Sequence, residues 1–340
     1  MNDMETKLID PEQVAEAGAI IRGGGLVAFP TETVYGLGAD AMNSAAVQKI
    51  FEAKGRPADN PLIVHISDKN QIPALAREIN ENARRLIEAF MPGPFTIILK
   101  KQKNIPDAVT AGLDTVGIRF PAESVAVRFI AAAGTPIAAP SANLSGSPSP
   151  TRAADVFSDM NGRIDAVIRG GNCEVGVEST IVDASGEVPV LLRPGGVTID
   201  QIREIVPGAE LDKNILKTVG KDEKPRCPGM KYRHYAPKAQ VIVVEGEQEA
   251  VQKKIRELLE ENRDKITGVL TMYGNVYDRP VMICGGSENR EYAKNLFSAL
   301  RDFDKLGVEL VFAEFCEKDG YGLAVKNRLY KAAGYQILHV

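Results

Sequence analysis

Residues 51–65, FEAKGRPADNPLIVH, bring two cations and two neutral hydrogen-bonding side chains into one short stretch: Lys54, Arg56, Asn60 and His65. A glycine and two prolines lie among them, and proline reduces the conformational entropy that such a segment loses on binding. Arginine suits forked contact with phosphate or carboxylate, and lysine suits a point-charge contact. The end of a predicted helix would explain Lys54 alone through the helix macrodipole, but not its neighbours. The stretch is typical of an anion-binding site.

Two further arginines occupy strand-like segments. VGIRFP (116–121) places Arg119 inside an apolar strand, where a charge is costly unless it is paired. Its partner is either an internal acid or an anionic ligand. Arg193 in LLRPG lies at a strand end and has the same two alternatives, an internal partner or a phosphate.

Hydroxyl-rich segments follow or begin other predicted strands. PTETVYGLG (30–38) carries two threonines, an acid and a tyrosine, which indicates either a hydrogen-bonding rim or a polar turn with Tyr35 half-buried. APSANLSGSPSPT (139–151) is typical of loops that bind phosphate and ribose, or of a solvated loop. GVESTIVD places Ser179 and Thr180 at another strand start.

These segments favour one ligand-binding crevice, because an open α/β sheet gathers the ends of its strands. The sequence offers no Ser/His/Asp triad, no metal-ligand cluster and no evident nucleophile. Positive charge with neutral hydrogen-bonding groups suits a polyanion together with a small zwitterion. Catalysis would then depend on positioning and charge stabilisation.

Composition narrows the class of protein. The 340 residues carry a net charge of −4, which disfavours tight binding of nucleic acid by a broad basic surface. No apolar run approaches the roughly 20 residues of a membrane span, and the polar start lacks a secretory core, so we expect a cytoplasmic protein. The four cysteines have no metal-site spacing. GLGADA (36–41) mimics a dinucleotide-binding motif without its strand–helix context, so we expect turn glycines there.

The elements indicate an α/β protein with two domains. In the first part we expect helices at 11–22, 44–53, up to Phe90 and at 124–133, and a mixed sheet of short strands. These strands are expected at 26–30, 62–66, 95–99, 116–121, 136–142 and in three segments up to about residue 194. Residues 213–238 hold eight Lys/Arg against two acids and predict a linker. After it, strictly alternating strands and helices predict a small parallel sheet.

The motifs together resemble a known family. PTETVYGLG, KGRP…NPLIVH, PGPFT, VGIRFP, APSANLSG, VESTIVD and LLRPG occur in the order and spacing of the YrdC-like family. The linker with PGMKYRHYAP and the α/β tail resemble its long, two-domain form, the threonylcarbamoyl-AMP synthases. The resemblance implies a YrdC-like open, mixed, twisted sheet with helices at 10–206, a basic linker or lid at 207–238, and a smaller Rossmann-like parallel α/β domain at 239–340.

The resemblance also implies a function and site residues. The enzyme would be a nucleotidyltransferase that forms L-threonylcarbamoyladenylate and pyrophosphate from L-threonine, bicarbonate or CO₂, and ATP with Mg²⁺ held by the phosphates. Its product would serve a tRNA threonylcarbamoyl transferase that modifies position 37 of tRNAs reading ANN codons. Lys54 and Arg56 would be catalytic. The ATP site would comprise Lys54, Arg56, Asn60, Thr115, Ser141, Asn143, Ser149, Arg193 and Tyr235. The threonine site would comprise Thr33, Tyr35, His65, Arg119, Ala139 and Ser179, with His65 as a neutral wall.

Three other functions are alternatives to this one. The basic linker allows an RNA-binding module, or weak RNA binding beside catalysis. Related domains occur in carbamoyltransferases, which carry extra zinc-finger modules that four scattered cysteines cannot build. The third alternative is a regulatory protein that senses ATP or threonine, and only a demonstration of catalytic turnover would exclude it.

Overall fold

The computed structural model describes residues 5–216, 225–228, 234–272, 274–278, 281–316 and 320–340. The chain divides into two compact units. The first comprises residues 1–145, 149–174 and 178–231, and the second comprises residues 146–148, 175–177 and 232–340. The predicted limits of the linker remain a prediction, since much of it lies outside the described residues.

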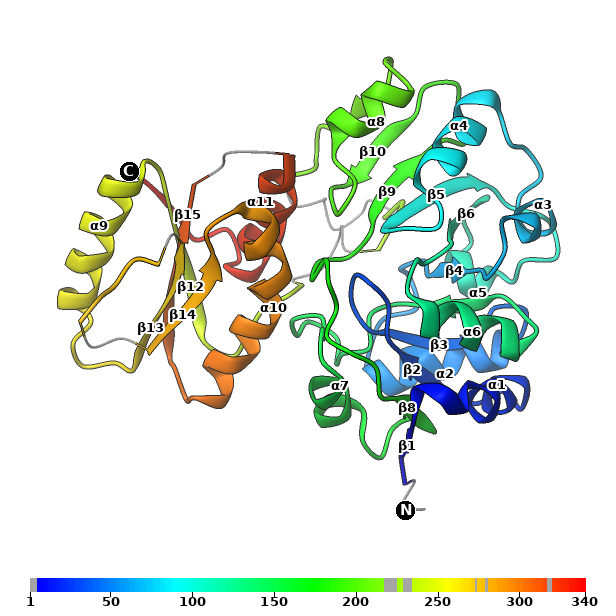
Figure 1. Ribbon diagram of the computed structural model, residues 1–340, viewed down its shortest axis with the longest axis horizontal. Coiled ribbons are helices and arrows are strands. Elements are labelled where there is room, and N and C mark those ends of the chain that lie inside the picture. Colours follow the sequence, from blue (N-terminus) through cyan, green and yellow to red (C-terminus); the bar gives the residue numbers. More distant parts are fainter. Residues whose placement is uncertain (1–4, 217–224, 229–233, 273, 279–280, 317–319) are drawn as a thin grey trace. The chain divides into compact units, whose positions relative to one another are not determined.

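Within the described part of the first unit, the central element is a mixed sheet of eleven short strands (Figure 1). Their spatial order is β1-β8-β2-β3-β7-β4-β6-β5-β9-β10-β11. The strands are β1 (Lys7–Ile9), β2 (Val27–Phe29), β3 (Gly36–Asp40), β4 (Ile63–His65), β5 (Phe95–Lys100), β6 (Thr115–Arg119), β7 (Ile137–Ala139), β8 (Ala166–Ile168), β9 (Thr180–Asp183), β10 (Val190–Arg193) and β11 (Glu210–Leu211). Parallel and antiparallel neighbours alternate irregularly, so the prediction of a mixed sheet is confirmed.

Short helices surround this sheet. They are η1 (Pro11–Gln13), α1 (Val14–Arg22), α2 (Ser44–Lys54), η2 (Lys69–Gln71), α3 (Ile72–Leu75), α4 (Glu81–Phe90), α5 (Asp107–Thr110), α6 (Ser124–Ala133), α7 (Ala153–Met160) and α8 (Ile199–Ile205). Helices α1 and α6 pack together, and Ile21, Phe129 and Ile130 join Phe29 and Ile137 of the sheet in one buried cluster. Burial of these large apolar side chains is the main stabilising contribution here.

The glycines of GLGADA were expected to lie in a turn, but the structure places them in strand β3. The reason is the ring of Phe29 on the neighbouring strand. A Cβ on Gly36 would lie 3.0 Å from that ring, and a Cβ on Gly38 would lie 2.8 Å from Ile137. The glycines therefore allow close packing of β2, β3 and β7, and they do not form a nucleotide-binding loop.

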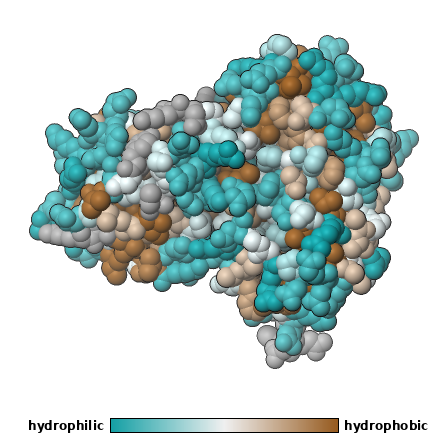
Figure 2. All heavy atoms as spheres, in the orientation of Figure 1, coloured by the Kyte–Doolittle hydropathy of each residue, from teal (hydrophilic) through white to brown (hydrophobic). Residues whose placement is uncertain are grey.

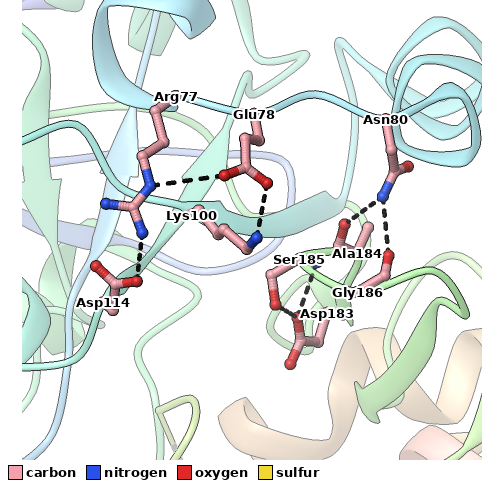
Figure 3. Close-up of polar contacts among 9 residues, drawn as sticks. All are labelled: Arg77, Glu78, Asn80, Lys100, Asp114, Asp183, Ala184, Ser185 and Gly186. Atoms are coloured by element: carbon pink, nitrogen blue, oxygen red, sulfur yellow. Dashed lines mark hydrogen bonds and ion pairs between the residues drawn. The ribbon is translucent and has the colours of Figure 1, made fainter.

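Polar contacts hold α4 and the β9–β10 turn together (Figure 3). Asn80 accepts from the N–H of Ala83 as the N-cap of α4 and donates to the carbonyls of Ala184 and Gly186, at 3.1 and 2.8 Å. Beside it, Glu78 pairs with Arg77 and Lys100 on the surface. Exposed ion pairs of this kind contribute little to stability. We regard the contacts of Asn80 and Glu78 as structural and not as part of a ligand site.

Within its described residues, the second unit holds a parallel sheet of five strands in the order β14-β13-β15-β12-β16. The strands are β12 (Gln240–Glu245), β13 (Thr267–Met272), β14 (Val281–Gly286), β15 (Leu310–Phe315) and β16 (Ile337–His339), and the helices are α9 (Gln248–Glu261), α10 (Asn289–Lys305) and α11 (Gly320–Ala332). Val251, Ile255 and Leu258 of α9 pack against the strands in a buried cluster. The predicted Rossmann-like parallel domain is confirmed.

No helix in the described residues is both long and apolar enough to cross a membrane. On the face drawn in Figure 2, hydrophilic residues predominate and apolar residues form scattered groups. Scattered apolar residues are usual on protein surfaces.

Candidate active site

Lys54 lies at the end of α2 and is 3% exposed. Its ammonium group donates to the carbonyl of Ser141, and to the carbonyl and side-chain oxygen of Asn143 at 2.6 and 3.5 Å. The N–H of Ser145 in turn donates to the carbonyl of Lys54 at 2.9 Å. A buried ammonium with several oxygen partners fixes the backbone around it. Lys54 therefore organises the loop that carries Ser141 and Asn143.

Arg56 and Asn60 lie just beyond α2, which ends at Gly55 in a left-handed conformation. The Nη2 of Arg56 donates to the carbonyls of Asn60 and Pro61 at 3.3 and 3.4 Å. Asn60 is 1% exposed, and neither its amide nitrogen nor its amide oxygen has a hydrogen-bond partner in the described residues. Leaving buried polar atoms unpaired costs about 1–3 kcal/mol. Such an amide indicates a place for a ligand.

A row of register partners crosses the sheet. His65 on β4 lies opposite Arg119 on β6, Arg119 lies opposite Thr96 on β5, Thr96 lies opposite Ile181 on β9, and Ile181 lies opposite Arg193 on β10. Register partners on adjacent strands point to the same face of a sheet. The fold thus brings the predicted residues His65, Arg119 and Arg193 to one face, although they are far apart in the sequence.

Ser179 joins this row directly. Its hydroxyl lies 2.8 Å from the hydroxyl of Thr96, and Arg193 donates to its carbonyl at 3.0 Å and to its hydroxyl at 3.1 Å. The next residue back, Glu178, accepts a hydrogen bond from the hydroxyl of Ser149. Residues predicted for the ATP site and for the threonine site are therefore linked around β9.

The PTETVYGLG segment lies beside the APSAN loop. Backbone hydrogen bonds of 2.8–2.9 Å join Tyr35 and Leu37 to Pro140, Ala142 and Pro150. These bonds bring the segment that carries Thr33 next to the segment that carries Ala139 and Ser141.

Tyr35 is fully buried rather than half-buried. Its hydroxyl accepts from the N–H of Gly170 and donates to the carbonyl of Gly171, both at 3.1 Å. Burial raises the pKa of this hydroxyl. In this structure Tyr35 therefore supports the segment through backbone contacts.

Arg119 has an internal acid as a partner. Its Nη2 lies 2.7 Å from Oε1 of Glu32, and the two side chains are 4% and 12% exposed. The hydroxyls of Thr31 and Thr33, 2.9 Å apart, lie within the same turn as Glu32. Sequence reasoning noted an acid in this turn but did not assign it a role, and it missed Thr96 and Glu178. Thr96 follows PGPF within a quoted motif, so its spacing was the available signal.

His65 is 4% exposed, and its Nδ1 lies 3.1 Å from the carbonyl of Ile63. Its ring meets the ring of Phe29 edge-on, with the centroids 5.7 Å apart. Burial, and secondarily the nearby Arg119, lower the pKa of His65 to about 3. The imidazole is therefore neutral at pH 7, whereas its role as a wall of the threonine site stays a prediction.

This lowered pKa predicts a pH dependence of stability. An unfolded chain takes up the His65 proton near pH 6.5, whereas the folded chain takes it up only near pH 3. The unfolded state binds more protons between these values, so the free energy of unfolding falls as the pH falls from about 6.5 toward 3. Urea unfolding at pH 7, 6 and 5 should show a steeper loss for the wild type than for His65→Gln. Parallel losses in the two proteins would contradict the prediction.

A narrow pocket lies against the face that carries the row. Its lining includes Thr96, Thr115 and Gly117 from the sheet, and Cys227 and Pro228 from the predicted linker. Cys227 is 1% exposed and packs in an apolar cluster with sheet residues. Part of the predicted linker thus covers this face within the first unit.

Gly117 gives a direct test of the pocket. A Cβ at this position would lie 3.4 Å from Thr96 and 3.7 Å from Ile63, so one methyl group fits and further methyls must extend into the pocket. We expect Gly117→Val to keep the fold, because valine favours strands, and to weaken ATP binding about tenfold or more. Calorimetric titration with ATP measures this, and Gly117→Ala is the matched control with a smaller effect. Unchanged ATP affinity in Gly117→Val would show that the ligand does not use this pocket.

Tyr235, also predicted for ATP, belongs to the second unit. Its φ is +65°, and its ring stacks on Phe297 with the centroids 5.0 Å apart. Within the segment 207–238, which was predicted as a linker or lid, His234 is also described, while Tyr232 and Arg233 lie outside the described residues. In the described residues, no group of three or more His, Cys, Asp or Glu side chains could hold a metal ion.

Comparison with known proteins agrees with this architecture. Residues 19–195 match the Sua5/YciO/YrdC family model, described as "Telomere recombination", and residues 197–334 match the model described as "Threonylcarbamoyl-AMP synthase, C-terminal domain". The threonylcarbamoyl-AMP synthase of Pyrococcus abyssi is 47% identical over 98% of this chain and 97% of its own. That of Bacillus subtilis is 47% identical over 97% of this chain and 95% of its own.

A solved structure extends the likeness to three dimensions. P. abyssi Sua5, complexed with L-threonine, has a TM-score of 0.94 with 47% identity and covers 98% of this chain and 100% of that chain. A two-domain α/β enzyme of the nucleotidyltransferase type is therefore confirmed. The chain belongs to the threonylcarbamoyl-AMP synthase family, in its long, two-domain form.

Proposed function

We propose that this chain forms L-threonylcarbamoyladenylate and pyrophosphate from L-threonine, bicarbonate or CO₂, and ATP. Family membership supports the activity, and the threonine complex of the P. abyssi relative supports the amino-acid substrate. We further propose that the reaction takes place in the cytoplasm and that a separate tRNA threonylcarbamoyl transferase uses the adenylate at position 37 of tRNAs reading ANN codons.

The observation that carries the proposal is the buried amide of Asn60, which lies next to Arg56 and has no hydrogen-bond partner in the described residues. Asn60 directly follows the segment with Lys54 and Arg56, and Arg56 bonds its carbonyl. Buried polar groups nearly always have partners, so an amide with neither atom satisfied favours a polar ligand. The adjacent positive charge favours a phosphate-bearing one.

The two substrates would occupy neighbouring parts of one site. ATP would contact Lys54, Arg56, Asn60, Thr115, Ser141, Asn143, Ser149, Arg193 and Tyr235. Threonine would contact Thr33, Tyr35, His65, Arg119, Ala139 and Ser179. The hydrogen bonds between Arg193 and Ser179 support a common boundary between them.

In the proposed mechanism, the neutral amine of threonine adds to bicarbonate and gives an N-carboxylate and water, or adds to CO₂ and gives the N-carboxylate and a proton that passes to solvent. A carboxylate oxygen then attacks the α-phosphorus of ATP, a phosphorus–oxygen bond forms, and the bond to the leaving pyrophosphate breaks. Lys54, Arg56 and Arg193 would stabilise charge on the phosphates, together with the Mg²⁺ that ATP carries. Neutral His65 would border the threonine without taking its proton. Because a carbamate is labile in water, the segment at Cys227 and Pro228 would help to exclude solvent.

Pyrophosphate release tests the proposal. The purified protein is mixed with ATP and Mg²⁺, and L-threonine and bicarbonate are each supplied or omitted. We expect release only when both are present. Release without threonine would indicate ATP hydrolysis or another acceptor. ATP binding without any release would favour a sensor, and weak RNA binding would then be tested by filter binding at two salt concentrations.

A further inference from the structure

The pair formed by Glu32 and Arg119 is incompletely satisfied. One bond joins them, from Nη2 of Arg119 to Oε1 of Glu32 at 2.7 Å. The second carboxylate oxygen, Oε2 of Glu32, and the Nε of Arg119 are both buried and have no hydrogen-bond partner in the described residues. An arginine and a carboxylate commonly form two parallel bonds, which would use both of these atoms. Here the pair instead offers one acceptor and one donor.

The surroundings keep both side chains in place. Arg119 ends β6 between His65 and Thr96 on the neighbouring strands. Glu32 lies in a turn in which the hydroxyl of Thr31 donates to the carbonyl of Val34 and accepts from the N–H of Thr33. Breaking a buried pair by removing one partner is strongly unfavourable, so neither charge is readily released to solvent.

We propose that Glu32, beside the Arg119 already predicted for the threonine site, recognises the amino group of the bound α-amino acid. Arg119 donates from Nε to the carboxylate, and Oε2 of Glu32 accepts a hydrogen bond from the amino group. Glu32 is thus a binding residue that selects substrates with an amine at the α-carbon, and it orients that amine for the addition step. The identity of the amino acid rests on the proposed function, whereas the recognition of its amine by Glu32 does not.

The chemistry distinguishes this role from a purely structural one. A carboxylate oxygen accepts from an ammonium group or an amine, whereas an amide nitrogen can only donate. In Glu32→Gln, the amide oxygen can still accept from Arg119 Nη2, but the position of Oε2 then holds a donor that faces the amine. The substitution therefore changes the preference for an amine while it preserves the bond to Arg119.

The test compares L-threonine with L-serine, L-alanine and the threonine analogue in which a hydroxyl replaces the α-amine. Binding to the full chain is measured by calorimetric titration. We expect the wild type to prefer threonine over its hydroxy analogue, and Glu32→Gln to lose threonine affinity about tenfold or more, with little change for the analogue. Glu123→Gln, which alters another acid in the first unit that caps α6, should keep the wild-type preference. Thermal unfolding and ATP titration verify that each variant is folded.

Three results would overturn the proposal: unchanged threonine affinity in Glu32→Gln, an equal loss for threonine and its analogue, or a wild type that binds no amino acid. An equal loss would mean that Glu32 only holds Arg119. Binding of serine or alanine with the same dependence on the amine and on Glu32, but no binding of threonine, would contradict the proposed substrate and support the role of Glu32. If Glu32→Gln fails to fold, Glu32→Asp in the same titrations provides the measurement: its shorter carboxylate should lower the affinity for threonine and leave the affinity for the hydroxy analogue nearly unchanged.

Discussion

Replacing Lys54 by methionine should reduce formation of the adenylate about 100-fold or more, while the fold survives. The ammonium group has two expected roles: it holds the loop carbonyls of Ser141 and Asn143, and it would stabilise charge on the phosphates. A 100-fold loss corresponds to about 2.7 kcal/mol of transition-state stabilisation, within reach of a lost charged contact and a misplaced loop. Pyrophosphate release and thermal unfolding measure the two effects.

Lys49→Met is the matched control on the same helix. Lys49 is exposed, and its ammonium group donates to the carbonyl of Gly24 at 2.7 Å. We expect nearly normal turnover in this control. Normal turnover in Lys54→Met would contradict the assignment of the phosphate site.

Asn60→Leu should make the protein more stable and less active. Leucine branches at the same carbon as asparagine, has the same number of side-chain heavy atoms, and removes two buried polar atoms that lack partners in the described residues, so the free energy of unfolding should rise by about 1–3 kcal/mol. The same change removes the groups expected to contact ATP, and ATP affinity should fall about tenfold or more. Urea unfolding measures the expected gain in stability, and calorimetric titration measures the expected loss of ATP affinity.

Asn80→Leu gives the contrasting control. The side chain of Asn80 caps α4 by accepting from the N–H of Ala83, and it donates two further hydrogen bonds to the backbone, which Figure 3 shows. Its removal should lower stability by about 1 kcal/mol or more and leave ATP binding intact. If Asn60→Leu also lowered stability and kept its ATP affinity, the amide of Asn60 would be structural.

The sequence predicted those elements of the fold whose apolar pattern and end signals agree. Helix α6 begins at Ser124 and ends before Gly134, as expected, although the capping carboxylate is that of Glu123. The alternating strands and helices after residue 239 were also predicted. Helix α8 was missed, although Thr198 and Gln201 form a capping box that marks its start. Strand β3 was missed because glycines that fit against Phe29 have the same spacing as turn glycines.

The site was predictable as a set of residues but not as a set of contacts. Sequence spacing indicated that Arg119 needs a partner, but only the register of β4, β6 and β5 shows which side chains lie beside it. The choice of Glu32 as its partner depends on a turn 87 residues away in the sequence. The buried state of Asn60 likewise depends on packing between distant segments and has no local signal.

Mass spectrometry of the reaction product tests the central claim most directly. The protein is incubated with ATP, Mg²⁺, L-threonine and ¹³C-labelled bicarbonate, and the products are analysed at once because the adenylate is labile. We predict a species that contains AMP, threonine and one labelled carbon, and that forms about 100-fold more slowly when Lys54→Met replaces the wild type. An adenylate of threonine without the labelled carbon, or AMP and pyrophosphate alone, would contradict the account.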